Sequence, residues 1–209
     1  MEFHEAVRSR QSIREFKPDP VAPEVLLRLL EAFRAAPSWA NVQPWELILV
    51  QDPELRRRLQ QTLSPGNPAT KAVAEAPVLV AAVGIAGRSG WYKGESVTAR
   101  GDAWMLFDLG IACEHLALAA AAEGLGTVHA GYFDFAKAGE ILGVPAGRSV
   151  VELIPVGWPA RLPRRVERKP LAELVSLDRH GNPFPLPAAP SGSGERPPSR
   201  DGGPLSAAR

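Results

Sequence analysis

Cysteine is almost absent from this sequence. Cys113 is the only one in 209 residues, so an internal disulfide cannot form and a reducing, cytoplasmic setting is expected. The sequence also lacks an excess of positive or negative charge, because its formal net charge is +1. The protein therefore has no global field to attract nucleic acid or an anionic membrane. The N-terminal stretch MEFHEAVRSR contains no apolar run, so we expect no secretory signal.

Signatures of several enzyme classes are missing as well. No G-x-G-x-x-G follows the first expected strand, and there is no Walker loop, no H-E-x-x-H and no G-x-S-x-G. The four histidines are scattered along the chain, which argues against a clustered metal site. Cys113 lies in an apolar segment and is expected to pack in the core rather than to act as a nucleophile. The sequence thus offers no evident catalytic dyad.

The sequence does contain a regular alternation of helical and strand patterns. Hydrophobic residues are 45% of the chain, enough for a sizeable core. Residues 76–85, APVLVAAVGI, are continuously apolar, which is typical of a strand covered on both faces. Interleaved strands and helices predict an α/β or α+β layered domain. The expected helices are 2–8, 23–35, a segment opened by Asp52-Pro53, 103–123 and 136–142, and the other expected strands are 45–50, 125–130 and 150–156.

The C-terminal residues differ in composition from the rest. From residue 186 the chain is mostly Pro, Gly, Ser, Ala and Arg. Such a segment cannot bury enough apolar surface to offset its ordering entropy. We therefore predict one domain, residues 1–185, followed by a disordered tail, residues 186–209.

Segment 103–123 is the longest apolar stretch. Its length fits a membrane span, but charges at Asp108 and Glu114 would be costly at that depth, so a buried helix is expected. A helix that is apolar around most of its circumference must be buried on all sides, and a chain of this size has little interior. We therefore expect an intersubunit interface here. Six residues place Asp108 and Glu114 on different faces of the helix, so capping or ion pairing across the dimer is expected rather than a carboxylate pair.

Two polar segments are candidates for binding. In Arg10–Phe16 (RQSIREF), Arg10, Ser12 and Arg14 would project to one side of an extended chain, and their donors suit phosphate. The alternative is a solvated basic turn. The Gly-rich segment 86–100 is a candidate lid because Trp91 and Tyr92 lie in its middle, although both aromatics could also simply anchor a surface loop.

These pieces together resemble the FMN-dependent nitroreductase family. The match is carried by four stretches in the family's order, spread over nearly all of residues 2–175. The resemblance implies an α+β subunit with a central mixed β-sheet flanked by helices, in an intertwined homodimer with FMN at the interface. The stretches are Ser9–Phe16 (SRQSIREF), Ala36–Trp45 (APSWANVQPW), Leu116–Thr127 with His129–Asp134 (LALAAAAEGLGT, HAGYFD), and Pro155–Pro159 with Arg168–Leu171 (PVGWP, RKPL).

The resemblance also implies roles for residues at one end of FMN. Arg10, Gln11 and Ser12 would hold the phosphate, and Arg168 would close the same phosphate from the far end of the chain. Arg14 would point toward the flavin N1/O2 edge, where a cation stabilises the reduced flavin. Some members have a lysine two residues before Arg168, where this chain has valine. Either Arg164 or Arg165 would substitute for that lysine, or the phosphate would be held less fully.

Other implied roles concern the flavin ring. Pro37, Ser38 and Asn41 would come from the partner subunit, and Gln43 belongs to the same motif. Trp39 would form either part of the substrate platform or interface packing. A backbone N–H near Ala130-Gly131 would donate to flavin N5 or O4. The candidates for a side chain on the flavin pyrimidine are Asn67 and Lys71.

The implied activity is that of an FMN oxidoreductase. NADH or NADPH would donate a hydride to flavin N5, and an electron-poor acceptor such as a nitroaromatic or a quinone would then be reduced in ping-pong order. The alternatives are a specialised member, such as a reductive dehalogenase or an enoyl reductase, a flavin-sequestering protein with little turnover, and a non-enzymatic dimeric scaffold with a phosphate site.

Overall fold

The computed structural model describes residues 1–187. Their contacts divide the chain into two compact units, Met1–Arg165 and the part that begins at Val166. Most of the predicted tail, residues 188–209, lies outside the described residues. The predicted boundary between a domain of 1–185 and a tail therefore stays a prediction.

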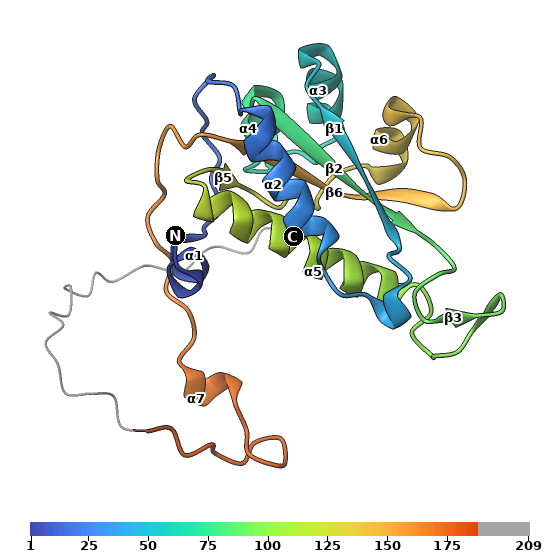
Figure 1. Cartoon of the computed structure of the whole chain (residues 1–209), viewed down its shortest axis with the longest axis vertical. Coiled ribbons are helices and arrows are strands. Elements are labelled where there is room, and N and C mark those ends of the chain that lie inside the picture. The colour runs from blue at the N-terminus through green and yellow to red at the C-terminus, as the bar shows by residue number, and fades with distance from the viewer. Residues whose placement is uncertain (188–209) are drawn as a thin grey trace, which may run out of the picture. The chain divides into compact units, whose positions relative to one another are not determined.

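The first unit is built on a four-stranded sheet in the order β1-β2-β6-β5 (Figure 1). Every pairing between these strands is antiparallel. The predicted mixed character is limited to one isolated parallel bridge, between Ser12 and Thr127. The strands are β1 (Trp45–Val50), β2 (Val78–Ile85), β5 (Gly126–Thr127) and β6 (Arg148–Gly157).

Both faces of this sheet are covered, as the continuous apolar run of β2 predicts. Alternate side chains of β2 enter different cores: Leu79 and Ala81 belong to one cluster, Val78 and Val80 to the other. The first cluster includes residues of α3 (Pro53–Gln60), α4 (Thr70–Glu75) and α6 (Phe135–Leu142). The second includes residues of α2 (Pro23–Arg34) and α5 (Ala103–Ala122). The result is a helix–sheet–helix arrangement of the α+β class.

Local signals account for several helix ends. Asp52 caps α3, because its Oδ1 accepts hydrogen bonds from the backbone N–H groups of Glu54 at 2.7 Å and Leu55 at 3.2 Å. Gly143 ends α6 in the left-handed conformation. The sequence did not predict α4, which has six residues and no side-chain cap. The strand predicted over 125–130 is reduced to the two residues of β5, and Ala130 meets Leu153 through a separate bridge.

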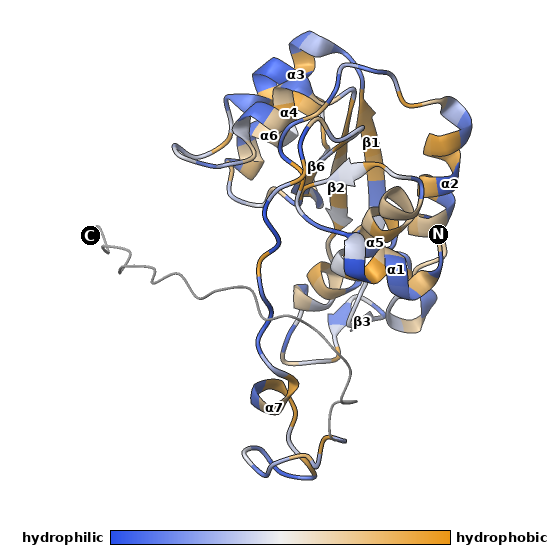
Figure 2. Cartoon of the chain, turned by 90° about the vertical axis from the view of Figure 1, so that its left-hand side faces the viewer, coloured by the Kyte–Doolittle hydropathy of each residue, from blue (hydrophilic) through white to orange (hydrophobic). Residues whose placement is uncertain are grey.

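Helix α5 is buried on one side only within the chain. Leu109, Ala112 and Leu116 are nearly inaccessible, whereas Leu106 is 50% and Phe107 is 59% exposed. The prediction that this helix is buried on all sides is thus not met by one chain. Figure 2 shows apolar colour along much of α5. Among the described residues it is the one helix long and apolar enough to cross a membrane, and half of its apolar window is buried.

The described part of the second unit, residues 166–187, contains one short helix, α7 (Leu171–Leu174), and a bridge between Ser176 and Pro183. Most of its large apolar side chains are exposed to solvent. Exposed ones are Leu171, Leu174, Val175, Leu177, Phe184 and Leu186.

Gly126 on β5 provides the close approach on which the N-terminal segment depends. A Cβ at this position would lie 2.5 Å from Cγ1 of Ile13, which is itself 3% exposed. We expect Gly126→Ala to lower the free energy of unfolding by about 1–3 kcal/mol, since the buried Ile13 must move. Urea denaturation measures this. Gly131→Ala is the control, because a Cβ there meets nothing within 4 Å and the variant should unfold like the wild type.

Candidate functional site

The segment Arg10–Arg14 runs beside β5, where Ser12 forms a parallel bridge with Thr127. It follows α1 (Phe3–Ser9), and the backbone N–H of Ile13 donates to the carbonyl of Thr127 at 2.8 Å. Ile13 is buried, while the side chains of Arg10, Gln11 and Ser12 are half-buried and Arg14 is exposed. The buried isoleucine fixes the segment and leaves its polar side chains accessible.

A pocket of about 170 Å³ opens beside this segment. Arg10, Gln11 and Ile13 line it from one side, and Ala117 and Ala121 of α5 line it from another. Whole-ligand pockets usually span about 300–1,000 Å³. One chain therefore forms only part of a site for a ligand of flavin size.

The polar groups here are of the kind that binds an anion. Nε of Arg10 lies 3.2 Å from Oε1 of Glu114, so one edge of the guanidinium is directed at α5. Oγ1 of Thr127 is buried and has no hydrogen-bond partner among the described residues. Nη1 of Arg14 contacts the carbonyl of Ser12 at 3.4 Å, which directs Arg14 back along its own segment.

Glu114 also approaches His129, which follows β5. Oε2 of Glu114 lies 3.3 Å from the buried Nε2 of His129, without the alignment of a hydrogen bond, and Nδ1 of His129 lies 2.7 Å from Oε1 of Glu152 on β6. The carboxylates of Glu114 and Glu152 raise the pKa of His129 to about 9. For Glu114 the sequence predicts capping or ion pairing across the dimer. Within one chain Glu114 pairs with Arg10, and its use across a dimer stays a prediction.

The Pro37–Gln43 motif contacts a different part of α5, at Asp108. The motif contains the short 3₁₀ helix η1 (Trp39–Asn41). Three residues of the motif that are not glycine have positive φ angles: Ala40 at 43°, Asn41 at 57° and Gln43 at 47°. Such backbone is costly and persists where its surroundings hold it. Here Ser38 Oγ accepts from Gln43 N at 2.9 Å.

Asp108 holds this motif against α5. It is 3% exposed, and its Oδ2 accepts from the backbone N–H of Trp39 at 3.0 Å and from the hydroxyl of Ser89. The ring of Trp39 packs on Trp104, with centroids 5.0 Å apart. The contact with Trp104 anchors Trp39 within the chain, and the half-buried ring leaves area for another molecule. Both alternatives for Trp39, substrate platform and interface packing, therefore stay predictions.

The two groups of predicted site residues meet different faces of α5. Glu114 contacts the Arg10 segment, and Asp108 contacts the Trp39 motif. Six residues separate these carboxylates by about 9 Å along the helix and about 240° around it. One chain therefore does not bring Arg10–Ser12 and Pro37–Gln43 to a single pocket.

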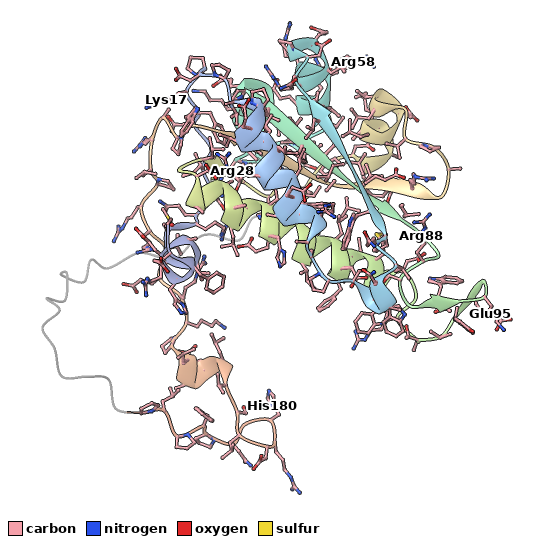
Figure 3. The ribbon with its side chains drawn as sticks, viewed as in Figure 1. Lys17, Arg28, Arg58, Arg88, Glu95 and His180 are labelled. Carbon is pink, nitrogen blue, oxygen red and sulfur yellow. The ribbon has the colours of Figure 1, made fainter. Side chains whose placement is uncertain are left out.

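The predicted lid segment forms a small hairpin of β3 (Trp91–Tyr92) and β4 (Glu95–Ser96). Nε1 of Trp91 donates to Oδ1 of Asp102 at 2.9 Å, so Trp91 anchors the loop. Tyr92 is 66% exposed at the hairpin, with the Lys93 ammonium 5.4 Å from its ring centre. Figure 3 labels Arg88 and Glu95 on the same loop, and both are exposed. Of the two predicted aromatics, Tyr92 is the more exposed, and Trp91 is half-buried.

The two candidates for a side chain on the flavin pyrimidine, Asn67 and Lys71, both have partners within the chain. Asn67 uses both ends of its amide within the chain: Nδ2 donates to the carbonyl of Tyr132 at 2.8 Å, and Oδ1 accepts from Ala69 N at 2.9 Å. It thereby supports the loop that contains Gly131, beside Ala130. Lys71 pairs with Glu75 one turn along α4 at 3.7 Å.

Arg168 lies in the second unit, so its role stays a prediction. Arg165 belongs to the first unit and donates through Nη2 to the carbonyl of Arg8, at the end of α1 and close in sequence to Arg10. Sequence reasoning missed Glu114, His129 and Thr127 as partners of this region. No short-range signal marks them, because they come from separate elements.

Cys113 behaves as predicted. It is 1% exposed on α5, and burial, with a contribution from Glu152, raises the pKa of its thiol. The thiol is therefore protonated near neutral pH and packs in the core.

Known proteins share this fold. The family model described as "Nitroreductase family" matches residues 7–158. A curated relative from Thermus thermophilus named NADH dehydrogenase is 28% identical over 203 residues, covering 81% of this chain and 93% of that protein. One from Nematostella vectensis named iodotyrosine deiodinase is 24% identical over 199 residues, covering 84% of this chain and 75% of that protein.

Solved structures agree. A nitroreductase family protein from Clostridium novyi NT is 31% identical with a TM-score of 0.69, covering 88% of this chain and 97% of that chain. An FMN-dependent nitroreductase from Clostridium difficile R20291 is 25% identical with a TM-score of 0.65, covering 78% of this chain and 91% of that chain. The four-stranded sheet between two helical layers and the match over residues 7–158 lead to one conclusion: this chain belongs to the nitroreductase family.

Proposed function

We propose that this protein is an FMN-dependent NAD(P)H oxidoreductase that binds its flavin between two copies of the chain. The observation that carries the proposal is the segment Arg10–Ser12: Arg10 and Gln11 line a partial pocket with a guanidinium and an amide, and the half-buried Ser12 follows them directly in the chain. This donor set suits a phosphate monoester. The FMN dependence of the Clostridium difficile relative supports the same ligand.

The residues present fit FMN in two further respects. Gly131 is exposed and has nothing within 4 Å of the position of a Cβ, so the loop after β5 leaves room for a planar ring near its backbone N–H. The exposed side chains of Asn41 and Gln43 and the half-buried ring of Trp39 are held in a strained loop, where a second copy of the chain would find them already ordered.

Two copies are needed for a complete site. The Arg10 segment and the Trp39 motif meet different faces of α5, so each would contribute to a different flavin. The exposed apolar row of α5, with Leu106 and Phe107, provides a surface for the second copy. The homodimer predicted from the sequence is part of this proposal.

The chain's own groups have three tasks in this function. Arg10, Gln11 and Ser12 bind the phosphate, Arg14 places a positive charge near the flavin pyrimidine, and the loop at Ala130-Gly131 offers a backbone donor. Bound FMN would supply the redox chemistry, a ping-pong transfer of reducing equivalents from NADH or NADPH to an electron-poor acceptor. No side-chain acid or base is required for that transfer.

The experiment is a reduction cycle with the purified protein. We expect a yellow protein whose visible flavin absorbance is bleached by NADH or NADPH under nitrogen and restored by a nitroaromatic or a quinone. A bleached flavin that no acceptor reoxidises would instead support the flavin-sequestering alternative. A colourless protein that binds no added FMN would contradict the proposal and leave the phosphate-binding scaffold.

Reductive dehalogenation is the second candidate. The similarity to proteins named iodotyrosine deiodinase favours it, and so does the exposed pair Tyr92 and Lys93 on the hairpin, where a particular aromatic substrate would be recognised. Halide release from an iodinated phenol by the reduced protein would establish this activity. Reoxidation by nitroaromatics without any halide release would reject it.

A further inference from the structure

Four ionisable side chains form a continuous row behind the expected phosphate site. They come from the N-terminal segment, α5, the residues after β5, and β6. Successive contacts measure 3.2 Å from Arg10 to Glu114, 3.3 Å from Glu114 to His129, and 2.7 Å from His129 to Glu152. We propose that Glu114 and His129 are positioning residues that orient the Arg10 guanidinium toward the FMN phosphate. The inference rests on the proposed FMN site.

The position of Glu114 supports this role. It approaches Arg10 at Nε, so the two terminal nitrogens of the guanidinium remain for an anion. The side chain of Arg10 is 18% exposed and lines the pocket. A free arginine loses much rotamer entropy when it binds phosphate, and an ion pair that already holds the Arg10 side chain beside α5 reduces that cost.

The charge of His129 offsets that of Glu114. An isolated carboxylate next to a phosphate site would repel the ligand. His129 carries a proton over most of the physiological range, so the positive charges of His129 and Arg10 balance the negative charges of Glu114 and Glu152. The charged groups that face His129 are Glu114 from α5 and Glu152 from β6. The thiol of Cys113 lies beside Glu152 and adds no charge, because burial raises its pKa.

A role only in folding would weaken binding of any flavin. If the two residues instead orient Arg10, their replacement weakens the binding of FMN, which has the phosphate, and not the binding of a flavin without it. Riboflavin has the same ring as FMN and lacks the phosphate, so the ratio of the two dissociation constants separates these roles. Glu46→Gln is the matched control, because Glu46 is 48% exposed against 42% for Glu114 and also pairs with an arginine, Arg148.

The experiment titrates apoprotein with FMN and with riboflavin. We expect Glu114→Gln and His129→Gln each to weaken FMN binding on the order of tenfold, as happens when a partner that orients a metal ligand is lost. Riboflavin binding should change less than about twofold, well under that loss, and Glu46→Gln should change neither. In an Arg10→Ala background, Glu114→Gln should have almost no further effect, because Glu114 acts through Arg10.

The pH dependence of flavin binding gives a second test of the role of His129. The pKa of His129, about 9, lies above the ordinary 6.5. The cation is therefore present below that value and lost as pH rises through it, so the preference for FMN over riboflavin should fall there. Ionisation of the shared flavin ring cancels in the ratio, and the phosphate is a dianion well below this pH because its second pKa is about 6. The fall should be absent in His129→Gln.

The outcomes distinguish the two proposals. Equal losses of FMN and riboflavin binding in the variants, or no loss at all, would overturn the positioning role while the FMN site stands. An additive loss in the Arg10→Ala background would overturn it too. A wild type that binds neither flavin, or binds both equally well, would overturn the phosphate site itself.

Discussion

Replacing Arg10 with alanine should weaken FMN binding by about 10- to 100-fold, because a hydrogen bond to a charged group contributes about 1.5–3 kcal/mol. Arg10 is the half-buried cation of the segment on β5 and the one that lines the pocket. Isothermal titration of the apoprotein measures the loss. Riboflavin affinity should change little, since the missing group faces the phosphate.

The control for Arg10→Ala is another arginine in an ion pair. Arg34 on α2 pairs with Glu31 at the surface, and its side chain is 72% exposed. Arg34→Ala should bind FMN like the wild type. Unchanged FMN affinity in Arg10→Ala, with a folded protein, would remove the central residue of the proposed site.

Replacing Leu106 with arginine should separate the proposed dimer into single chains. Leu106 lies in the exposed apolar row of α5 and is 50% exposed in one chain. An unpaired charge buried at an interface costs about 3–5 kcal/mol, which corresponds to at least about 100-fold weaker association. FMN should be lost together with the dimer, because Ser38 and Asn41 of the second copy would no longer reach the flavin.

Leu27→Arg is the matched control for this variant. Leu27 is also a leucine on a helix, α2, and is 59% exposed. Sedimentation equilibrium should give single chains for Leu106→Arg and a dimer for Leu27→Arg. If both variants stay dimeric and keep FMN, the exposed face of α5 is not the interface.

Much of the fold is predictable because its signals are local. The continuous apolar run of β2 indicates a strand covered on both faces, and its side chains do alternate between two cores. Asp52-Pro53 predicts the start of α3, and the hydrogen bonds of Asp52 confirm it. Helix α4 gave no such signal, because six residues are too few for a helical period to show.

The site is less predictable because its parts are distant in sequence. The side-chain donors of Arg10–Arg14 are enough to predict an anion-binding segment. The contact of Arg10 with Glu114, and of Glu114 with His129, depends on how α5 and β6 pack. Asp108 and Glu114 were correctly placed on different faces of one helix, yet nothing near Asp108 in the sequence indicates that it accepts from Trp39. Long-range contacts of this kind follow from the tertiary fold, not from local pattern.

The central claim is that two copies of this chain hold FMN between them. Sedimentation velocity of the purified protein, recorded in the visible absorbance band of the flavin, tests it most directly. The flavin should move with a species of twice the 22.4 kDa chain mass. Flavin that moves with a single chain, or a two-chain species that carries no flavin after loading with FMN, would contradict the claim.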